Sequence, residues 1–82
     1  RPVGRPALNA IFLHYKDRPG IIATIGSALY SNGINIDNIA APADHSTQEA
    51  LAVLKTNKPV SDELLNKIAG EIDAITAFSL DV

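Results

Sequence analysis

Four stretches of the chain have the apolar patterns of β-strands. Residues 7–16 and 48–56 are apolar on both alternating faces through their centres, which indicates strands with neighbours on each side. Residues 34–41 predict another strand, which Pro42 ends because proline cannot donate to a β-ladder. Residues 74–82 alternate apolar and polar positions and predict a strand with one wet face. The alternating positions are Phe78, Leu80 and Val82 against Ser79 and Asp81.

Two helices are predicted between these strands, from apolar residues at helical spacing. Pro19 suits the first position of the first helix, where its missing N–H group costs nothing, and Gly33 suits the left-handed residue after its end. Ser61 can cap the second helix, and Asp62 and Glu63 suit its positive end. The two apolar stripes are Ile21, Ile22, Ile25 and Leu29, and then Leu64, Leu65, Ile68 and Ile72.

The elements follow one another as strand, helix, strand, strand, helix, strand. A polar loop at residues 42–47, which contains His45, joins the second and third strands into a hairpin. This order predicts an α+β, ferredoxin-like βαββαβ fold, with a four-stranded antiparallel sheet in the order 4-1-3-2 and both helices on one face. We expect one domain at residues 7–82. Residues 1–6 are expected to be a linker from an upstream domain, in a chain that begins at Arg1 rather than Met.

Composition and charge exclude several classes of function. The net charge of −2 and the scattered basic residues argue against nucleic-acid binding. No apolar run approaches the ~20 residues that span a bilayer, so no membrane partner is expected. The chain has no cysteine and therefore no disulfide or thiolate chemistry. It has two histidines and no paired carboxylates in an expected pocket, so we expect no catalytic residue and no metal site here.

Two polar positions stand at strand ends, and the topology separates them. Asp17 follows the first strand and Asn35 begins the second, which runs in the same direction. They therefore lie at opposite ends of the sheet, ~26 Å apart for eight residues at about 3.3 Å each. The second strand is an edge without lysine or internal proline, so two copies could pair through it. Antiparallel pairing would move the partner's Asn35 to the end that holds Tyr15 and Asp17.

The groups at this composite site match a small zwitterion. Asp17 and the side-chain oxygen of Asn35 can accept hydrogen bonds from an ammonium group, while the Asn35 amide and the free N–H groups at the helix start can donate to a carboxylate. Gly20 allows a ligand close to its own backbone and that of Ile21, and Tyr15 offers a hydroxyl. Serine fits this set best. In the structural alternative, Asp17 only favours the helix start and Asn35 is an ordinary edge-strand residue.

Two segments resemble the ACT domain family. They are residues 15–21, Tyr-Lys-Asp-Arg-Pro-Gly-Ile, and residues 32–36, Asn-Gly-Ile-Asn-Ile. ACT domains are small amino-acid-binding regulatory modules attached to many metabolic enzymes, and the resemblance covers the chain after its leader. Within the family, the chain looks most like the C-terminal ACT domains of D-3-phosphoglycerate dehydrogenases, the cytoplasmic, NAD-dependent enzymes that begin serine biosynthesis.

The resemblance implies a regulatory function through a homodimer. In that family, L-serine is bound between paired ACT domains and inhibits the dehydrogenase, whose catalytic domain lies upstream. The ligand positions fall on Tyr15, Asp17 and Asn35, whereas Arg18 shapes the loop and is not a ligand. NAD would belong to the parent enzyme, and no cofactor is implied for these residues.

Other functions on the same topology are kept as alternatives. One is a structural dimerisation domain without a ligand, and another is an ACT domain that senses a different amino acid for another enzyme. An acylphosphatase would need an arginine-bearing phosphate cradle, but Arg18 is followed at once by Pro19 and Gly20. An RNA-binding domain would need exposed aromatics on the central strands, where only Phe12 and Tyr15 occur.

Overall fold

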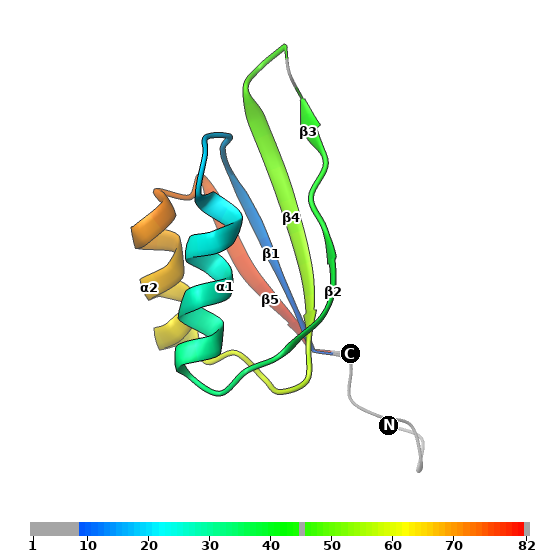
Figure 1. Cartoon of the computed structure of the whole chain (residues 1–82), viewed down its shortest axis with the longest axis vertical. Helices are drawn as coiled ribbons and strands as arrows, with labels where there is room; N and C mark the ends of the chain where they lie inside the picture. The colour runs from blue at the N-terminus through cyan, green and yellow to red at the C-terminus, as the bar shows by residue number, and fades with distance from the viewer. Residues whose placement is uncertain (1–8, 45, 82) are drawn as a thin grey trace.

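Two helices lie against one face of an antiparallel sheet (Figure 1). The computed structural model describes residues 9–44 and 46–81. The elements are β1 (Asn9–Lys16), α1 (Ile21–Ser31), β2 (Ile36–Ala40), β3 (Ala43–Asp44), β4 (Glu49–Thr56), α2 (Asp62–Ile72) and β5 (Thr76–Asp81). The expected linker at residues 1–6, His45 and Val82 lie outside the described residues. Neither helix is long and apolar enough to cross a membrane.

The sheet has the expected topology. Its main strand order is β2-β4-β1-β5, and every pairing is antiparallel. With β4 as the third predicted strand and β5 as the fourth, this is the order 4-1-3-2 read from the other edge. The two long strands, β1 and β4, are central, as their apolar runs predicted. The ferredoxin-like fold is therefore confirmed.

The loop predicted at residues 42–47 contains a short strand that the sequence did not reveal. Ala43 and Asp44 form β3, which pairs with Ala50 and Glu49 of β4. The backbone continues along the same side of β4 because the Leu51 N–H donates to the Pro42 carbonyl at 3.0 Å. Proline at this position cannot donate a ladder bond, so it interrupts the edge without ending it.

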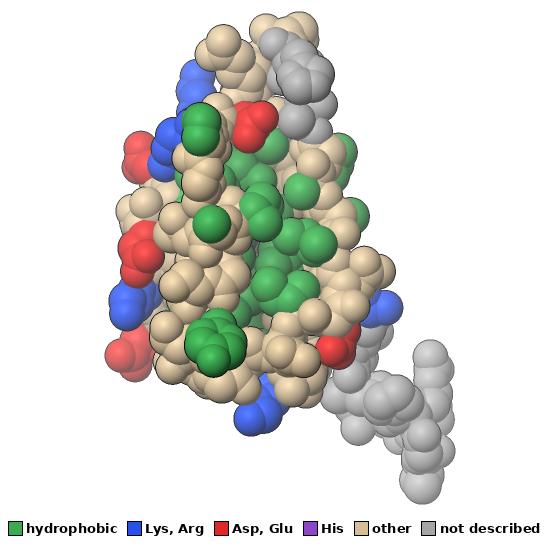
Figure 2. Space-filling view, viewed as in Figure 1, with side chains coloured by type: hydrophobic (Ala, Val, Ile, Leu, Met, Phe, Trp, Pro, Cys, Tyr) green, Lys and Arg blue, Asp and Glu red, His purple; other side chains and the backbone are tan. Residues whose placement is uncertain are grey.

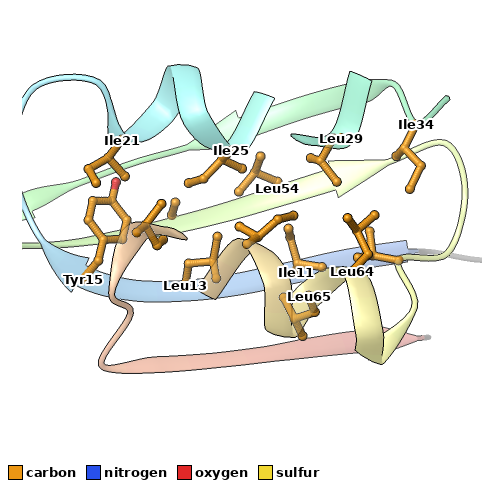
Figure 3. Packing of buried hydrophobic residues seen from close by; sticks show 14 of the residues in the cluster. Ile11, Leu13, Tyr15, Ile21, Ile25, Leu29, Ile34, Leu54, Leu64 and Leu65 are labelled. Atoms are coloured by element: carbon orange, nitrogen blue, oxygen red, sulfur yellow. The ribbon is translucent and has the colours of Figure 1, made fainter. Parts of the chain in front are cut away.

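One face of the sheet and the two helices enclose the core (Figure 3). Strand alternation places Leu13 opposite Ala52 on this face, and both are fully buried. The helices supply Ile25 and Leu29 from α1 and Ile68 from α2, all three without exposed surface. Among the described residues, no helix lies on the opposite face of the sheet. The apolar alternation of β5 lies on that face, where Phe78 and Leu80 remain 41% and 44% exposed.

The helix boundaries confirm some of the expected signals and correct others. Ser61 caps α2, where its hydroxyl accepts from the Leu64 N–H at 3.2 Å, and Gly33 has the left-handed φ of 73°. The assignment of Pro19 to the first helical position was wrong. Gly20, with φ 90°, is the N-cap, and α1 begins one residue later. Ile22 was also wrongly included in the buried stripe, since it is 42% exposed.

Two glycines in and after α1 give a matched pair of stability predictions. A Cβ added at Gly26 or Gly33 meets nothing within 4 Å, so packing does not distinguish them. Gly26→Ala should raise the free energy of unfolding by about 0.5–1 kcal/mol, because alanine is the better helix former. Gly33→Ala should lower it by about 1–2 kcal/mol, because its positive φ is unfavourable for a residue with Cβ. Urea unfolding measures both, and equal effects of the two would contradict this account.

Candidate functional site

The loop after β1 is held by backbone and guanidinium contacts. The Asp17 N–H donates to the Gln48 carbonyl at 2.8 Å. The Arg18 guanidinium donates to the Lys16 carbonyl at 3.0 Å and to the Ile72 carbonyl at 2.6 Å. Ile72 ends α2, so the guanidinium meets the negative end of that helix. Arg18 therefore fixes the loop against β1 and α2, while the Asp17 carboxylate remains exposed.

The start of α1 faces this loop with unused donors. Gly20 is the N-cap, no side chain caps the helix, and its first turn carries no acidic residue. The first helical bond is made by the Thr24 N–H, which donates to the Gly20 carbonyl at 2.9 Å. The N–H groups of Ile21 and Ile22 consequently have no partner within the helix. Such a helix start favours an anionic group.

Tyr15 is almost completely buried beside the loop. It is 2% exposed, and Figure 3 shows its ring in the core with the oxygen directed toward Ile21. Its hydroxyl makes no hydrogen bond to a described residue. Every fully buried polar side-chain atom in the described part of the chain has a hydrogen-bond partner, so the Tyr15 hydroxyl is not fully buried and keeps some contact with solvent. Burial first, and the nearby Asp17 carboxylate second, raise the pKa of the phenol. The hydroxyl is thus a neutral group that can donate and accept.

Asn35 is fixed at the other end of the sheet. Its N–H donates to the Asn57 Oδ1 at 2.8 Å, and its carbonyl accepts from the Asn57 N–H at 3.0 Å. The side-chain amide of Asn35 makes no hydrogen bond to a described residue and is exposed at the surface. It is available to a ligand or to a second chain.

Within one chain, the two halves of the predicted site are far apart. Asp17 is bonded to Gln48 and Asn35 to Asn57, and β4 runs between these two anchors. Nine residues of extended strand correspond to ~30 Å at about 3.3 Å each. Figure 1 places the β1–α1 loop and the α1–β2 loop at opposite ends of the two-helix layer. A single copy therefore presents Tyr15, Asp17 and the helix start as one half-site, and Asn35 as another.

A groove in the described part of the chain lies away from these residues. It has a volume of about 420 Å³ between α1 and α2, and its lining includes Thr24, Ser27, Lys67 and Glu71 but none of the predicted site residues. We give this groove no role in effector binding, because none of the predicted site residues lines it. The two half-sites themselves lie open on the surface of one chain and would not form a cavity there. In the described part of the chain, no cluster of acidic and histidine side chains could hold a metal ion.

Two residues that position the site were missed in the sequence. Gln48 holds Asp17 through its carbonyl and has a left-handed φ of 60°, and Asn57 holds both backbone groups of Asn35. The Gln48 contact is made by the backbone and leaves no signal in residue type. Asn57 follows the strand predicted at residues 48–56, and only the strand register brings it beside Asn35.

A comparison with protein-family models identifies the chain. The match runs over residues 9–73, which include both half-sites, and its description is "ACT domain". The chain belongs to the ACT domain family. The sequence resemblance is thereby confirmed, together with the fold that it implied.

Curated relatives of this ACT domain are much longer than the chain. A D-3-phosphoglycerate dehydrogenase of Mycobacterium tuberculosis is 33% identical over 64 residues, which are 78% of this chain and 12% of that protein. One from Synechocystis is 35% identical over 79 residues, which are 92% of this chain and 14% of that protein. The ACT domain thus corresponds to about one eighth of such a dehydrogenase.

Solved structures extend the similarity in fold. A formyltetrahydrofolate deformylase from Pseudomonas syringae superposes with a TM-score of 0.81 at 17% identity, over 96% of this chain and 28% of that one. The regulatory subunit of aspartate kinase from Thermus thermophilus gives 0.70 at 21% identity, over 96% and 53%. At these identities the likeness concerns the fold alone.

The buried phenol predicts a pH effect on stability. The pKa of Tyr15 is higher in the folded than in the unfolded state, so the neutral phenol contributes to the free energy of unfolding. This contribution is complete at pH values below the unfolded pKa of about 10, and it is lost as the pH rises through the folded-state pKa. Tyr15→Phe should leave the free energy of unfolding at pH 7 within about 1 kcal/mol of the original and should flatten its decline above pH 10. Tyr30→Phe, at a position that is 82% exposed, should keep the original decline. Denaturant unfolding at several pH values measures this, and identical slopes in both variants would contradict it.

Proposed function

We propose that this ACT domain is the effector-binding regulatory domain of an NAD-dependent D-3-phosphoglycerate dehydrogenase. A small amino acid, in the first place L-serine, binds between two copies paired through β2. Each site combines Tyr15, Asp17 and the backbone of Gly20 and Ile21 from one chain with the partner's Asn35. The observation that carries the proposal is the separation of these groups in one chain, because antiparallel pairing of two copies closes it.

The β2 edge is suited to such pairing. Among the described strands, β2 is bonded only to β4, so its other edge is open. Ile39 of β2 and Ile22 of α1 are 39% and 42% exposed. Figure 2 shows hydrophobic side chains at the surface between these two elements. A second copy at this edge would extend the sheet and cover the adjoining apolar surface.

The strand register supports one position for the proposed two-fold axis. The level midway between Asp17 and Asn35 falls near Val53 of β4, and Ala40 of β2 pairs with Val53. An axis perpendicular to the sheet beside Ala40 would bring the partner's Asn35 level with Asp17. Ala40 is exposed and has a small side chain, which allows two edges to approach.

The chemistry of the combined half-sites favours a zwitterion. The Asp17 carboxylate and the side-chain oxygen of Asn35 would accept hydrogen bonds from the ammonium group. The uncapped N–H groups of Ile21 and Ile22 would bind the carboxylate. The Tyr15 hydroxyl, which has no partner among the described residues, could bond a hydroxyl on a short side chain.

Regulation follows from linkage between ligand binding and domain arrangement. A ligand that contacts both chains stabilises the paired arrangement over any other, and a differential affinity of about 1–3 kcal/mol is sufficient for useful control. The relatives extend far beyond this domain, so the NAD-dependent chemistry is assigned to the remainder of the parent enzyme. No residue of this chain is given a catalytic role.

The first test of the proposal measures ligand binding. L-serine should raise the melting temperature of the chain, because a ligand at hundredfold excess over Kd stabilises by about 2.7 kcal/mol. Asp17→Ala and Asn35→Ala should each abolish the rise, while Lys67→Ala, in the groove between the helices, should keep it. Glycine, L-threonine and L-aspartate form a comparison series. A melting temperature that none of these amino acids changes would leave the structural alternative, a dimerisation domain without a ligand.

Mixing the two variants tests whether the site is shared between chains. In a dimer of one Asp17→Ala chain and one Asn35→Ala chain, one site has lost both residues and the other has kept both. Calorimetric titration of the mixture should therefore recover about one quarter of the original serine stoichiometry if chains pair at random, although neither variant binds alone. Failure to recover binding, in a mixture whose chains are shown to exchange, would contradict a site shared between two chains.

Cross-linking locates the interface itself. The chain has no cysteine, so Ala40→Cys introduces a single thiol beside the expected two-fold axis. Opposed residues of antiparallel strands have Cα atoms about 4.5–5.5 Å apart, which a disulfide can bridge. Ala40→Cys should form a covalent dimer under mild oxidation, and Ser79→Cys, on the opposite edge strand β5, should remain monomeric on a non-reducing gel. The reverse pattern would place the interface on β5.

A further inference from the structure

The face of the sheet opposite the helices carries a continuous apolar surface. We call it the open face and define it by Phe12, Leu51, Val53, Phe78 and Leu80, which strand alternation and register place together. Phe12 and Phe78 stack with ring centroids 4.7 Å apart. Leu51, Phe78 and Leu80 are 36%, 41% and 44% exposed. Apolar side chains gathered on one face, rather than scattered, mark an interaction surface.

Charged groups lie toward the two ends of this face. At one end, Glu49 accepts a hydrogen bond of 2.6 Å from His14, and Lys16 stands opposite Glu49 in the register. Toward the other end lies Lys55, six residues from Glu49 along β4 and ~20 Å away at about 3.3 Å per residue. An apolar centre with a polar rim is the usual anatomy of a protein–protein interface.

We infer that two edge-paired dimers of this chain stack through their open faces and form a tetramer. The inference rests on the proposed function, because it takes the β2-paired dimer as its unit. Its partner is a second copy of the same dimer, and the contact is a sheet-on-sheet packing with the four helix pairs on the outside.

The area of the open face supports the dimer as the stacking unit. The strands β1, β4, β5 and β2 have 8, 8, 6 and 5 residues, so at about 4.8 Å between strands and about 3.3 Å per residue the face measures ~430 Å² per chain. Stacking two single chains would bury ~860 Å² in total, below the range of specific interfaces. Stacking two dimers would bury ~1,700 Å², which is the size of a stable one.

The charges on the open face are complementary to those of a second copy. The axis that closes the effector site passes at the level of Ala52 and Val53. Two dimers that stack symmetrically are related by a further two-fold axis at this same level, which runs across the strands in the plane between the sheets. This axis reverses the strand direction and brings Lys55 of each chain to the end of the other that holds Glu49. It also sets Leu51 of one chain near the level of the partner's Val53.

Sedimentation velocity of the 82-residue chain tests the tetramer. The mass should rise from dimer to tetramer of the 8.7 kDa chain as the concentration increases. Leu51→Lys places a charge in the apolar centre and should raise the dimer–tetramer dissociation constant about a hundredfold. Tyr30→Lys, on the far end of α1 and 82% exposed, should leave this constant unchanged.

A charge exchange tests whether the partner is a copy of the chain. Glu49→Lys and Lys55→Glu should each weaken the tetramer about tenfold, and the double variant should restore it. Restoration requires that the two residues meet across the interface, since they are too far apart to interact within β4. A double variant weaker than either single one would overturn the antiparallel stacking.

The outcomes separate this inference from the proposed function. A chain that stays dimeric at millimolar concentration, while Ala40→Cys still cross-links, overturns the tetramer and leaves the effector site intact. A tetramer that Leu51→Lys does not weaken also overturns it. Association that Leu51→Lys abolishes, in a chain whose Ala40→Cys variant fails to cross-link, would be contact between single chains through the open face. It would overturn both the shared site and the tetramer of edge-paired dimers.

Discussion

The antiparallel pairing of β1 with β4 is the constraint on which the rest of the structure depends. The two strands are paired over eight residues without a break, from Asn9 with Thr56 to Lys16 with Glu49. They form the centre of the sheet, bury Leu13 on the helix side, and set the distance between the two half-sites. The length of this ladder is the reason that one chain cannot complete the proposed site. In the proposed dimer it also sets the level at which a second chain would meet the first.

Both half-sites are attached to the ends of β4 by bonds that do not use their functional side chains. The backbone of Asp17 is held by Gln48, and the backbone of Asn35 is held by Asn57. The carboxylate and the amide stay free as a result, on backbone positions that the sheet makes rigid. Arg18 adds a contact from the same loop to the end of α2, so a shift of the loop would be felt by both helices. Preorganised groups of this kind lose little conformational freedom when a ligand binds.

The sequence predicted those parts of the fold that depend on local pattern. The order of elements, the central places of the two apolar strands, the Ser61 cap and the left-handed Gly33 all follow from residue type and spacing. The errors occur where tertiary contacts decide. Gly20 is the N-cap and α1 begins at Ile21, so Pro19 is not the first helical residue. Ile22 is largely exposed although its spacing fits the stripe. The ligand roles of Tyr15, Asp17 and Asn35 stay a prediction from the sequence. Asn57 and Gln48 position two of these residues through register and backbone, which residue types do not encode.

Exposed apolar surface connects the stability of this small domain with its assembly. A chain of this length buries only roughly 60–65% of its unfolded surface. The apolar side chains that it leaves in contact with water are grouped, with Ile22 and Ile39 at one edge and Leu51, Phe78 and Leu80 on one face. Covering either patch with a second copy adds burial that the single domain cannot reach. A ligand that bridges two chains at the edge would strengthen their association, and association would strengthen ligand binding by the same free energy. Effector affinity is then a property of the assembled state, and protein concentration belongs among the variables that control it.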